Sequence, residues 1–234
     1  MLWRSIHNRL YEDIATGHYK PGEKLPTETE LARRFGVNRH TVRHAMAELR
    51  DHGIVYSRRG AGIFVATIPM TYKIGRETRF SKNLLDAQQA PALRFLRLET
   101  RYADKIERKN LALGRSAEVH VVEGIGLSNN IPITHFTSIF PAAPLDGFIT
   151  ALKTSGSIST ALSACKIMDF ERQRTEITAI LATPETAAHL ACQVGDPLLR
   201  TRSLNRSDGV PIEYGTSLFS ANHIAFVVGE DSSD

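Results

Sequence analysis

The sequence predicts an α+β protein in two parts, a small helix-rich domain followed by a larger antiparallel sheet with helices. Three observations support this prediction. The first 66 residues fit three amphipathic helices and one hairpin, whereas the rest alternates between β-prone runs and short helical segments. At 234 residues, the chain is long enough for two ordinary domains. Its charge is also uneven, because residues 1–68 hold eleven Lys and Arg against seven Asp and Glu, and the remainder holds eighteen of each.

The composition excludes several classes of protein. Hydrophobic residues make up 42% and charged residues 23%, as in soluble globular proteins. No stretch approaches the roughly 20 apolar residues that span a bilayer, and the N-terminus has no continuous apolar core of a signal peptide. Cys165 and Cys192 stand alone, without metal-ligand spacing. We therefore expect a cytoplasmic protein without a membrane partner, cofactor or metal ion.

The first part opens with two predicted helices. Apolar residues at three- and four-residue spacing predict a helix over residues 3–16, which ends at Gly17. After a connection rich in Pro and Gly, Thr27 and Glu30 have the form of a capping box and begin the second helix. Gly36 ends this helix.

A third helix and a hairpin complete the first part. Asn38 is a capping residue for a helix that runs to about His52. Two β-prone runs follow, residues 54–56 and 63–65, joined by a basic, glycine-rich tip at residues 57–62. Together these elements predict a winged helix-turn-helix.

This arrangement predicts DNA binding. In a helix-turn-helix, the start of the second helix enters the major groove and reaches the base edges. Arg39 and Arg43 are one helical turn apart, so both point to the same side, and an arginine fork bonds guanine or phosphate. Thr41 suits a phosphate contact. Arg58, Arg59 and the glycines of the tip suit phosphate or minor-groove contact, because glycine lets the backbone approach the duplex.

The second part alternates between strands and helices after a predicted linker at residues 67–78. Turn signals at Ser128-Asn129-Asn130 and Arg206-Ser207-Asp208-Gly209 mark two hairpins. Strands are expected at 92–103, 117–127, 131–140, 171–181, 197–205, 210–218 and 223–228, and helices at 81–89, 104–113, 144–154, 157–165 and 184–192. Hairpins interrupted by helices imply an antiparallel sheet.

The first part resembles the winged-helix domain of GntR-family bacterial regulators over residues 3–66. The resemblance is carried by Leu25-Pro26-Thr27-Glu28, by Phe35-Gly36-Val37-Asn38-Arg39-His40-Thr41-Val42-Arg43 and by Gly60-Ala61-Gly62-Ile63-Phe64-Val65. It implies operator contacts from Arg39, His40, Thr41 and Arg43 of the third helix, and from Arg59, Gly60 and Ala61 of the wing. Thr29 stands where many members carry arginine, which points to a different operator.

Residues 75–230 resemble the effector-binding (UTRA) domain of the HutC subfamily, whose fold is similar to chorismate lyase. The carriers are Arg79-Phe80-Ser81-Lys82-Asn83, Asn129-Asn130-Ile131-Pro132 and Pro211-Ile212-Glu213-Tyr214. Within this subfamily, Asn38-Arg39-His40-Thr41 and Arg79 to Asp86 most resemble regulators of phosphonate-utilisation operons. The expected domains are residues 1–66, a linker at 67–78, and an effector-binding and dimerisation domain at 79–234. The resemblance implies effector binding by Arg79, Phe80, Ser81, Lys82, Asn83, Glu213 and Tyr214.

The residues of that loop also favour an anionic effector, phosphonate- or phosphate-like. Arg79 offers two parallel hydrogen bonds and Ser81 a hydroxyl, at the expected start of a helix. Relatives usually place arginines near the positions held here by Glu123, Gly124, Gly126 and Leu127. Because Glu123 would repel a phosphate, we expect a remodelled pocket.

The sequence thus predicts a homodimeric, ligand-responsive repressor that binds double-stranded, inverted-repeat operator DNA and controls phosphonate genes. Two alternatives stay open. The effector can instead be a phosphosugar or a carboxylate such as urocanate, or the second domain can be a lyase-like enzyme. The sequence offers no independent catalytic set, so we predict that the chain is not an enzyme.

Overall fold

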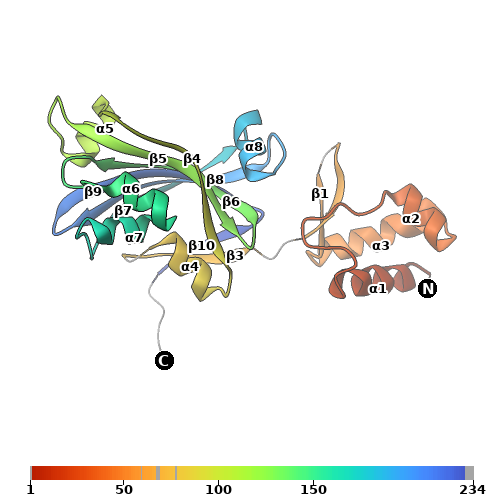
Figure 1. Cartoon of the computed structure of the whole chain (residues 1–234). Helices are drawn as coiled ribbons and strands as arrows, with labels where there is room; N and C mark the ends of the chain where they lie inside the picture. Colours follow the sequence, from red (N-terminus) through yellow and green to blue (C-terminus); the bar gives the residue numbers. More distant parts are fainter. Residues whose placement is uncertain (1, 59, 67–68, 77, 230–234) are drawn as a thin grey trace. The chain divides into compact units, whose positions relative to one another are not determined.

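The computed structural model describes residues 2–58, 60–66, 69–76 and 78–229. The chain divides into two compact units, residues 1–68 and 69–234 (Figure 1). The first unit holds three helices and a hairpin, and the second holds a large sheet with helices. The predicted α+β class is confirmed.

The first unit is built from three helices and one β-hairpin. These are α1 (Leu2–Ala15), α2 (Glu28–Phe35), α3 (Arg39–Asp51), β1 (Val55–Arg58) and β2 (Gly62–Val65). The predicted capping box begins α2, because the Thr27 amide donates to the Glu30 carboxylate at 2.7 Å and the Glu30 amide donates back to the Thr27 hydroxyl. Gly36 then adopts a left-handed conformation, and Asn38 caps α3 by accepting from the Thr41 amide.

One apolar cluster holds these elements together. Leu10 of α1, Leu31 of α2 and Met46 of α3 are fully buried in it. An ion pair adds a polar tie, since Arg34 of α2 donates at 2.7 Å to the buried carboxylate of Asp13 in α1. Because this packing uses the inner face of α3, the opposite face stays open to solvent.

The second unit contains eight strands and five helices among the described residues. They are β3 (Met70–Ile74), α4 (Phe80–Asp86), β4 (Pro91–Tyr102), α5 (Lys105–Leu111), β5 (Glu118–Ser128), β6 (Ile131–Pro141), α6 (Phe148–Ser155), α7 (Ile158–Ala164), β7 (Glu171–Leu181), α8 (Pro184–Leu190), β8 (Pro197–Ser207), β9 (Val210–Ser220) and β10 (Ile224–Val228). Six of the strands form one antiparallel sheet in the order β4-β5-β6-β9-β8-β7.

Two tight turns set the register of this sheet. Asn129 and Asn130 connect β5 to β6, and Asp208 and Gly209 connect β8 to β9. All four residues have positive φ, as a two-residue hairpin with the right twist requires. Both hairpins lie where the turn signals predict them.

Different helices cover the two faces of the six-stranded sheet (Figure 1). On one face α6 and α7 pack over Val122 and Phe136. On the other face α5 and α8 contact β6, and Leu111 of α5 joins a cluster with Val121 and Tyr214. Neighbouring residues of a strand therefore have opposite surroundings.

The segment expected to be a linker, residues 67–78, differs from the prediction. Residues 70–74 form β3, which pairs in parallel with β10 and places Tyr72 opposite Phe226. The Tyr72 ring is buried against Phe219 and Phe226. The second unit thus begins at residue 69 rather than 79, because a partner strand at the far end of the chain orders this short segment.

Candidate functional site

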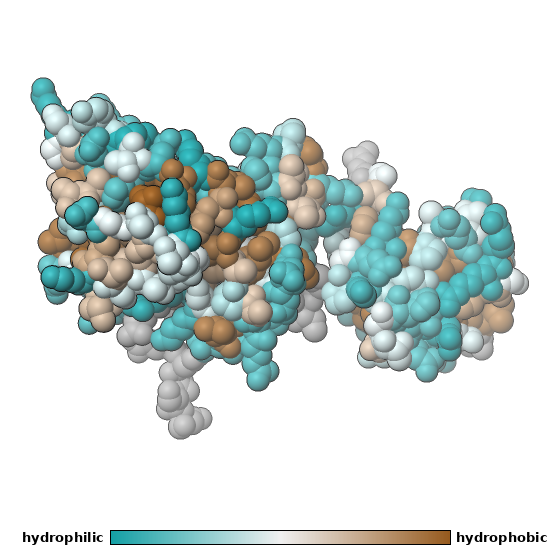
Figure 2. All heavy atoms as spheres, viewed as in Figure 1, coloured by the Kyte–Doolittle hydropathy of each residue, from teal (hydrophilic) through white to brown (hydrophobic). Residues whose placement is uncertain are grey.

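The start of α3 presents polar side chains to solvent. Arg39, His40 and Arg43 are exposed, and Thr41 is half-buried. The Thr41 hydroxyl donates to the Asn38 side chain at 2.9 Å, so it serves the helix cap. Figure 2 shows hydrophilic residues over most of the visible face of this unit. The residues predicted to contact DNA on α3 therefore share one accessible end of the helix.

Arg43 has a partner that the sequence did not indicate. Its Nε and Nη2 donate to the Glu28 carboxylate at 3.3 and 3.2 Å, which joins α3 to the start of α2. The Arg43 side chain is 61% exposed, so this is a surface ion pair worth about 0–1 kcal/mol. A phosphate or a guanine can replace Glu28 at little cost.

The tip of the hairpin contains four of the predicted DNA-contacting residues. Arg58 lies against its own hairpin, since its guanidinium donates to the Tyr56 hydroxyl at 2.9 Å and stacks 4.7 Å from the Phe64 ring centre. Gly60 is exposed with a φ of 74°, and Ala61 is half-buried. Arg59 lies outside the described residues.

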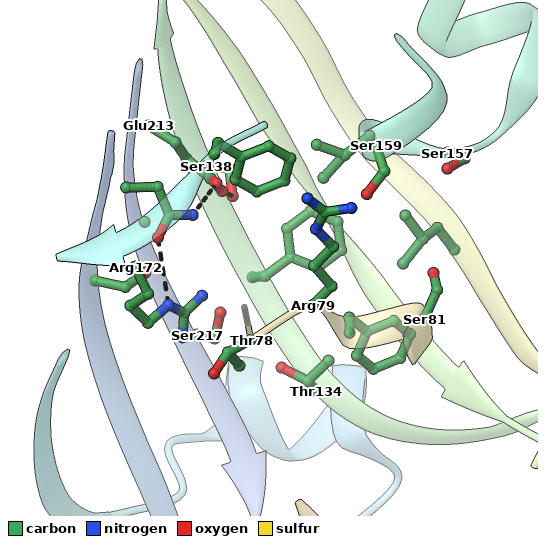
Figure 3. A pocket seen from close by; sticks show the side chains of 18 of the residues that line it. Thr78, Arg79, Ser81, Thr134, Ser138, Ser157, Ser159, Arg172, Glu213 and Ser217 are labelled. Atoms are coloured by element: carbon green, nitrogen blue, oxygen red, sulfur yellow. Dashed lines mark hydrogen bonds between the residues drawn. The ribbon is translucent and has the colours of Figure 1, made fainter. Parts of the chain in front are cut away.

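The second unit holds a pocket between the α6–α7 face of the sheet and α4 (Figure 3). It encloses about 770 Å³ of empty space, counting its open mouth. Hydroxyl groups dominate its polar lining, with two arginines, one glutamate and one asparagine. The polar lining residues are Tyr72, Thr78, Arg79, Ser81, Thr134, Ser138, Ser157, Ser159, Arg172, Ser203, Asn205, Glu213 and Ser217.

Four of the seven predicted effector-binding residues line this pocket, namely Arg79, Phe80, Ser81 and Glu213. Lys82 lines a neighbouring hollow instead. Asn83 is buried and bonds the backbone, because its Oδ1 accepts from the Lys73 amide at 2.6 Å and its Nδ2 donates to the Lys73 carbonyl at 3.1 Å. Asn83 therefore ties α4 to β3 rather than facing the pocket.

Tyr214 also lies away from the pocket, which corrects the prediction for this residue. It packs in the cluster of Leu111 and Val121 on the α5 side of the sheet. Successive residues of a strand point to opposite faces, so Glu213 and Tyr214 cannot both face one pocket. Glu213 is the one that does.

Glu213 is held by a chain of polar contacts. Its Oε1 accepts from the Ser138 hydroxyl at 2.6 Å, and its Oε2 accepts from the Asn205 amide at 2.6 Å. Asn205 in turn accepts from Nε of Arg172 at 3.3 Å. The chain crosses from β6 through β9 and β8 to β7, so the sheet register positions every member.

Two buried polar atoms of the pocket lack a hydrogen-bond partner in the described structure. They are Nε of Arg79 and Oγ1 of Thr134. Thr134 is only 3% exposed, and the Arg79 guanidinium lies 4.5 Å from the centre of the Phe170 ring. Because an unsatisfied buried donor costs about 1–3 kcal/mol, both atoms favour a ligand or ordered water at this place.

Glu123 does not face the pocket, contrary to the expected repulsion of an anion. Its carboxylate accepts from Arg97 at 3.0 Å and contacts His135 at 3.1 Å on the opposite face of the sheet. Alternation along β5 places Gly124 and Gly126 on the pocket side instead. The expected charge conflict therefore does not arise.

Gly126 makes room for the pocket wall. A Cβ there would lie 2.6 Å from the tip of the Phe80 ring and 2.5 Å from a methyl of Thr134. Phe80 precedes Ser81 in α4, and Arg79 is the residue just before this helix. The absence of a side chain at Gly126 thus lets the Arg79 loop approach the sheet closely.

Tyr72 is the most perturbed titratable group of the lining. Burial raises the pKa of its phenol to about 12, with a further contribution from the Glu213 carboxylate and an opposing one from Arg172. The phenol therefore stays protonated and neutral at ordinary pH.

Several lining residues were not singled out from the sequence, among them Thr134, Ser138, Arg172 and Asn205. They are spread over three strands, β6, β7 and β8, and carry common residue types, so no local motif marks them. A usable signal existed only on β9, where alternation from Glu213 places residues 215, 217 and 219 on the same face.

The described residues contain no group of three or more His, Cys, Asp or Glu that could hold a metal ion. Among the described residues, neither Cys165 nor Cys192 forms a disulfide bond. No described helix is long and apolar enough to span a membrane.

Two family models match the chain, one on each unit. Residues 2–65 match the model of bacterial regulatory proteins of the gntR family, and residues 86–225 match the UTRA domain. The gntR match describes regulatory proteins rather than enzymes, as the sequence predicts.

Known proteins are similar over nearly the whole chain. A probable transcriptional regulator, PhnF of Escherichia coli, is 31% identical, covering 97% of this chain and 94% of its own. The transcriptional repressor NagR of Bacillus subtilis is 26% identical, covering 97% and 93%. The crystal structure of PhnF from Mycobacterium smegmatis matches with a TM-score of 0.63 at 21% identity, covering 97% of this chain and all of that one, and supports the fold.

Proposed function

We propose that this chain, which belongs to the GntR family of bacterial regulatory proteins and carries a UTRA domain, is a homodimeric repressor that releases its operator when a phosphonate binds. The operator is an inverted repeat, because two equivalent heads read two equivalent half-sites. The proposed targets are genes for phosphonate uptake or degradation.

The first unit supplies the proposed DNA contacts. Arg39, His40 and Arg43 are exposed at one end of α3, where a recognition helix meets base edges. Gly60 at the hairpin tip is open on the side where a side chain would project, so the backbone can approach phosphate closely. Arg58 supports the hairpin from within and is a weaker candidate for a direct contact.

The single observation that carries the proposed ligand class is that the lining of one pocket holds two unpartnered, buried polar atoms, Nε of Arg79 and Oγ1 of Thr134. The oxygens of a phosphonate can accept from these donors, and Arg172 adds a second positive charge to the lining. The surrounding serines can donate to the remaining phosphonate oxygens. This support holds for phosphate-like anions in general, and resemblance to the regulators of phosphonate operons narrows it to phosphonates.

The proposed release of DNA starts at Arg79. This residue immediately precedes α4, and Asn83 of α4 is bonded to Lys73 of β3 on both sides of its amide. β3 is the first element of the second unit. A ligand that draws Arg79 inward therefore acts on β3 and shifts the population of the arrangement that binds DNA.

The test is a titration of an inverted-repeat duplex with the full-length protein, in which fluorescence anisotropy reports operator binding. Ethylphosphonate is expected to weaken operator binding at least tenfold, whereas a sugar phosphate and urocanate at the same concentration leave it unchanged. Arg79→Ala should abolish the effect of ethylphosphonate and keep operator binding. The proposed ligand is wrong if the sugar phosphate or urocanate is the effective compound, and the proposed function is wrong if no inverted repeat is bound at modest salt.

A further inference from the structure

Gly215 of β9 lines the pocket without a side chain, and we call the part of the pocket wall in front of its Cα the recess. A Cβ at this position would lie 3.2 Å from Oγ of Ser203, 3.5 Å from Oγ of Ser138 and 3.6 Å from Oε1 of Glu213. The three oxygens belong to β8, β6 and β9, and all three residues line the pocket. Three oxygens from three neighbouring strands thus converge over the Cα of a residue that has no side chain.

The hydrogen bonds around this recess leave it rich in acceptors. The Ser138 hydroxyl gives its proton to Oε1 of Glu213 at 2.6 Å, so its lone pairs are what it offers to the recess. Each carboxylate oxygen of Glu213 accepts one such bond, from Ser138 and from Asn205, and a carboxylate has room for about four. The recess therefore calls for a group that donates several hydrogen bonds.

The charge of Glu213 also lacks direct compensation. Both of its hydrogen-bond donors are neutral, and none of the ion pairs among the described residues includes it. Arg172 reaches it only through the amide of Asn205. A partly buried carboxylate without a contacting cation is costly, and a bound cation would offset that cost.

We propose that this recess is an ammonium subsite formed by Glu213, Ser138 and Ser203. An ammonium group carries three N–H donors and no acceptor, which matches three converging oxygens, one of them charged. A hydroxyl would satisfy fewer of them, and an anion would be repelled by Glu213.

The subsite defines the ligand when it is combined with the anion-binding donors of the proposed function, on which this inference rests. Arg79 and Thr134 hold the phosphonate, and Glu213 holds an amine carried by the same molecule. Leu93, Phe136 and Ile158 also line the pocket and suit a short carbon chain between the two groups. The ligand is accordingly an aminoalkylphosphonate, a zwitterion.

Three probes that differ only at the far end of a two-carbon chain test this assignment. They are 2-aminoethylphosphonate, 2-hydroxyethylphosphonate and ethylphosphonate, each titrated calorimetrically into the full-length protein. The amino compound is expected to bind at least tenfold more tightly than either of the others. Glu213→Gln and Gly215→Ala should each reduce that preference to threefold or less, and Gly215→Ala, which keeps the charge of Glu213, should change the affinity for ethylphosphonate by less than threefold.

The two variants remove the subsite in different ways. Glu213→Gln removes the charge and disturbs the bond to Asn205, whereas Gly215→Ala leaves that bond in place and fills the recess. Gly215 has no positive φ, so alanine fits its backbone. Gly114→Ala is the matched control, because a Cβ there meets no atom within 4 Å, and it should keep the full preference.

Each other outcome overturns the ammonium subsite. If the amino and ethyl compounds bind equally, the ammonium subsite is wrong and the phosphonate proposal stands. If the amino and hydroxyl compounds bind equally, the recess is a site for neutral hydrogen-bond donors instead. A preference that survives both variants places amine recognition elsewhere. If none of the three compounds binds, the phosphonate proposal falls together with the subsite.

Discussion

The proposed DNA contact of Arg43 starts from an existing ion pair with Glu28, and this has a measurable consequence. Binding a base or phosphate through Arg43 requires the contact with Glu28 to be given up, and Glu28 also places a negative charge near the duplex. We predict that Glu28→Gln strengthens operator binding, by up to about fivefold, the equivalent of a surface ion pair of 0.2–1 kcal/mol. Operator titrations of the two proteins at one salt concentration measure this.

Glu12→Gln is the matched control for this prediction. It removes the same charge from an exposed position on α1, where Glu12 pairs with Arg9. Its operator affinity should equal that of the parent protein. A loss of affinity in Glu28→Gln would mean instead that Glu28 holds Arg43 in the geometry that DNA requires.

Glu107 gives a pH-dependent contribution to stability. Its buried carboxylate accepts from both terminal nitrogens of Arg101, at 2.8 and 2.7 Å, and from the Asp104 amide. The bonds from Arg101 lower the pKa of Glu107 below its usual value. A carboxyl whose pKa is lower in the folded state stabilises the protein above its unfolded pKa, and the contribution is lost as the pH falls through the folded pKa.

We therefore predict that Glu107→Gln lowers the free energy of unfolding by about 1–2 kcal/mol at pH 7, the lower part of the range for charged hydrogen bonds because Arg101 is partly exposed. The difference from the parent should begin to shrink as the pH falls below the pKa of Glu in the unfolded chain, about 4.3, and shrink further as the pH falls through the lower pKa of the folded state. Urea denaturation at pH 7 and pH 3.5 measures both values. A difference that stays constant with pH would show that the charge of Glu107 is not the cause.

At the scale of elements, sequence patterns predicted most segments because their signals are local. The capping box at Thr27 and the paired turn residues Asn129 and Asn130 define the ends of elements without help from the rest of the chain. The sequence did not predict β3, because this strand forms only by pairing with β10. In the chain, all six strands of the large sheet lie between the two. Long-range pairing of this kind leaves little trace in a five-residue segment.

The same distinction explains the candidate site. Arg79 and Ser81, which line the pocket, could be named from the sequence because they belong to a contiguous motif. Tyr214 lies outside the pocket and was named with Glu213 because the alternation of the strand was not applied. Thr134 and Asn205 come together in one pocket because the sheet order places β6, β9 and β8 side by side. Sequence alone does not specify that order.

The close approach of α4 to β5 gives an element-scale prediction. Gly126→Ala would place a Cβ within 2.6 Å of both the Phe80 ring and a Thr134 methyl, and neither belongs to a flexible chain end. We expect overpacking to cost about 1–3 kcal/mol of stability and to weaken ligand binding by displacing Arg79. Thermal unfolding and calorimetry measure the two effects. Gly114→Ala should show neither, and a Gly126→Ala protein with full stability and affinity would contradict the packing described here.

The hydrogen bonds between Asn83 of α4 and Lys73 of β3 give a second element-scale prediction. Asn83→Ala removes both hydrogen bonds to Lys73, together with the 3.3 Å bond from Nδ2 to the Arg79 carbonyl, and leaves the side chains that line the pocket unchanged. Ligand affinity should change by less than threefold and operator affinity should be retained, but the ligand should weaken operator binding much less than in the parent. Anisotropy titrations with and without ethylphosphonate measure this coupling. Unchanged coupling would show that the signal leaves the pocket by another route.

For the whole molecule, charge separates the two proposed binding activities. The excess of positive charge lies in residues 1–68, whereas the remainder is balanced. Binding of a polyanion by the first unit releases condensed counterions, so it depends steeply on salt. A small ligand in the pocket of the second unit meets only a few charges, namely Arg79, Arg172 and Glu213. Its binding therefore releases no condensed counterions.

We predict that the logarithm of the operator affinity falls linearly with the logarithm of the salt concentration, with a slope of about −0.9 for each phosphate contacted, while ligand affinity changes by only a few-fold between 50 and 200 mM salt. Arg43→Ala should reduce the steepness of the operator slope by about one per head if Arg43 contacts phosphate, and leave it unchanged if Arg43 reads only a base. Arg115→Ala, which removes the same charge from an exposed position of the second unit, should leave the slope as it is. Because both slopes come from one protein in one buffer series, equal salt dependence of the two binding reactions would contradict the assignment of DNA and ligand to separate units.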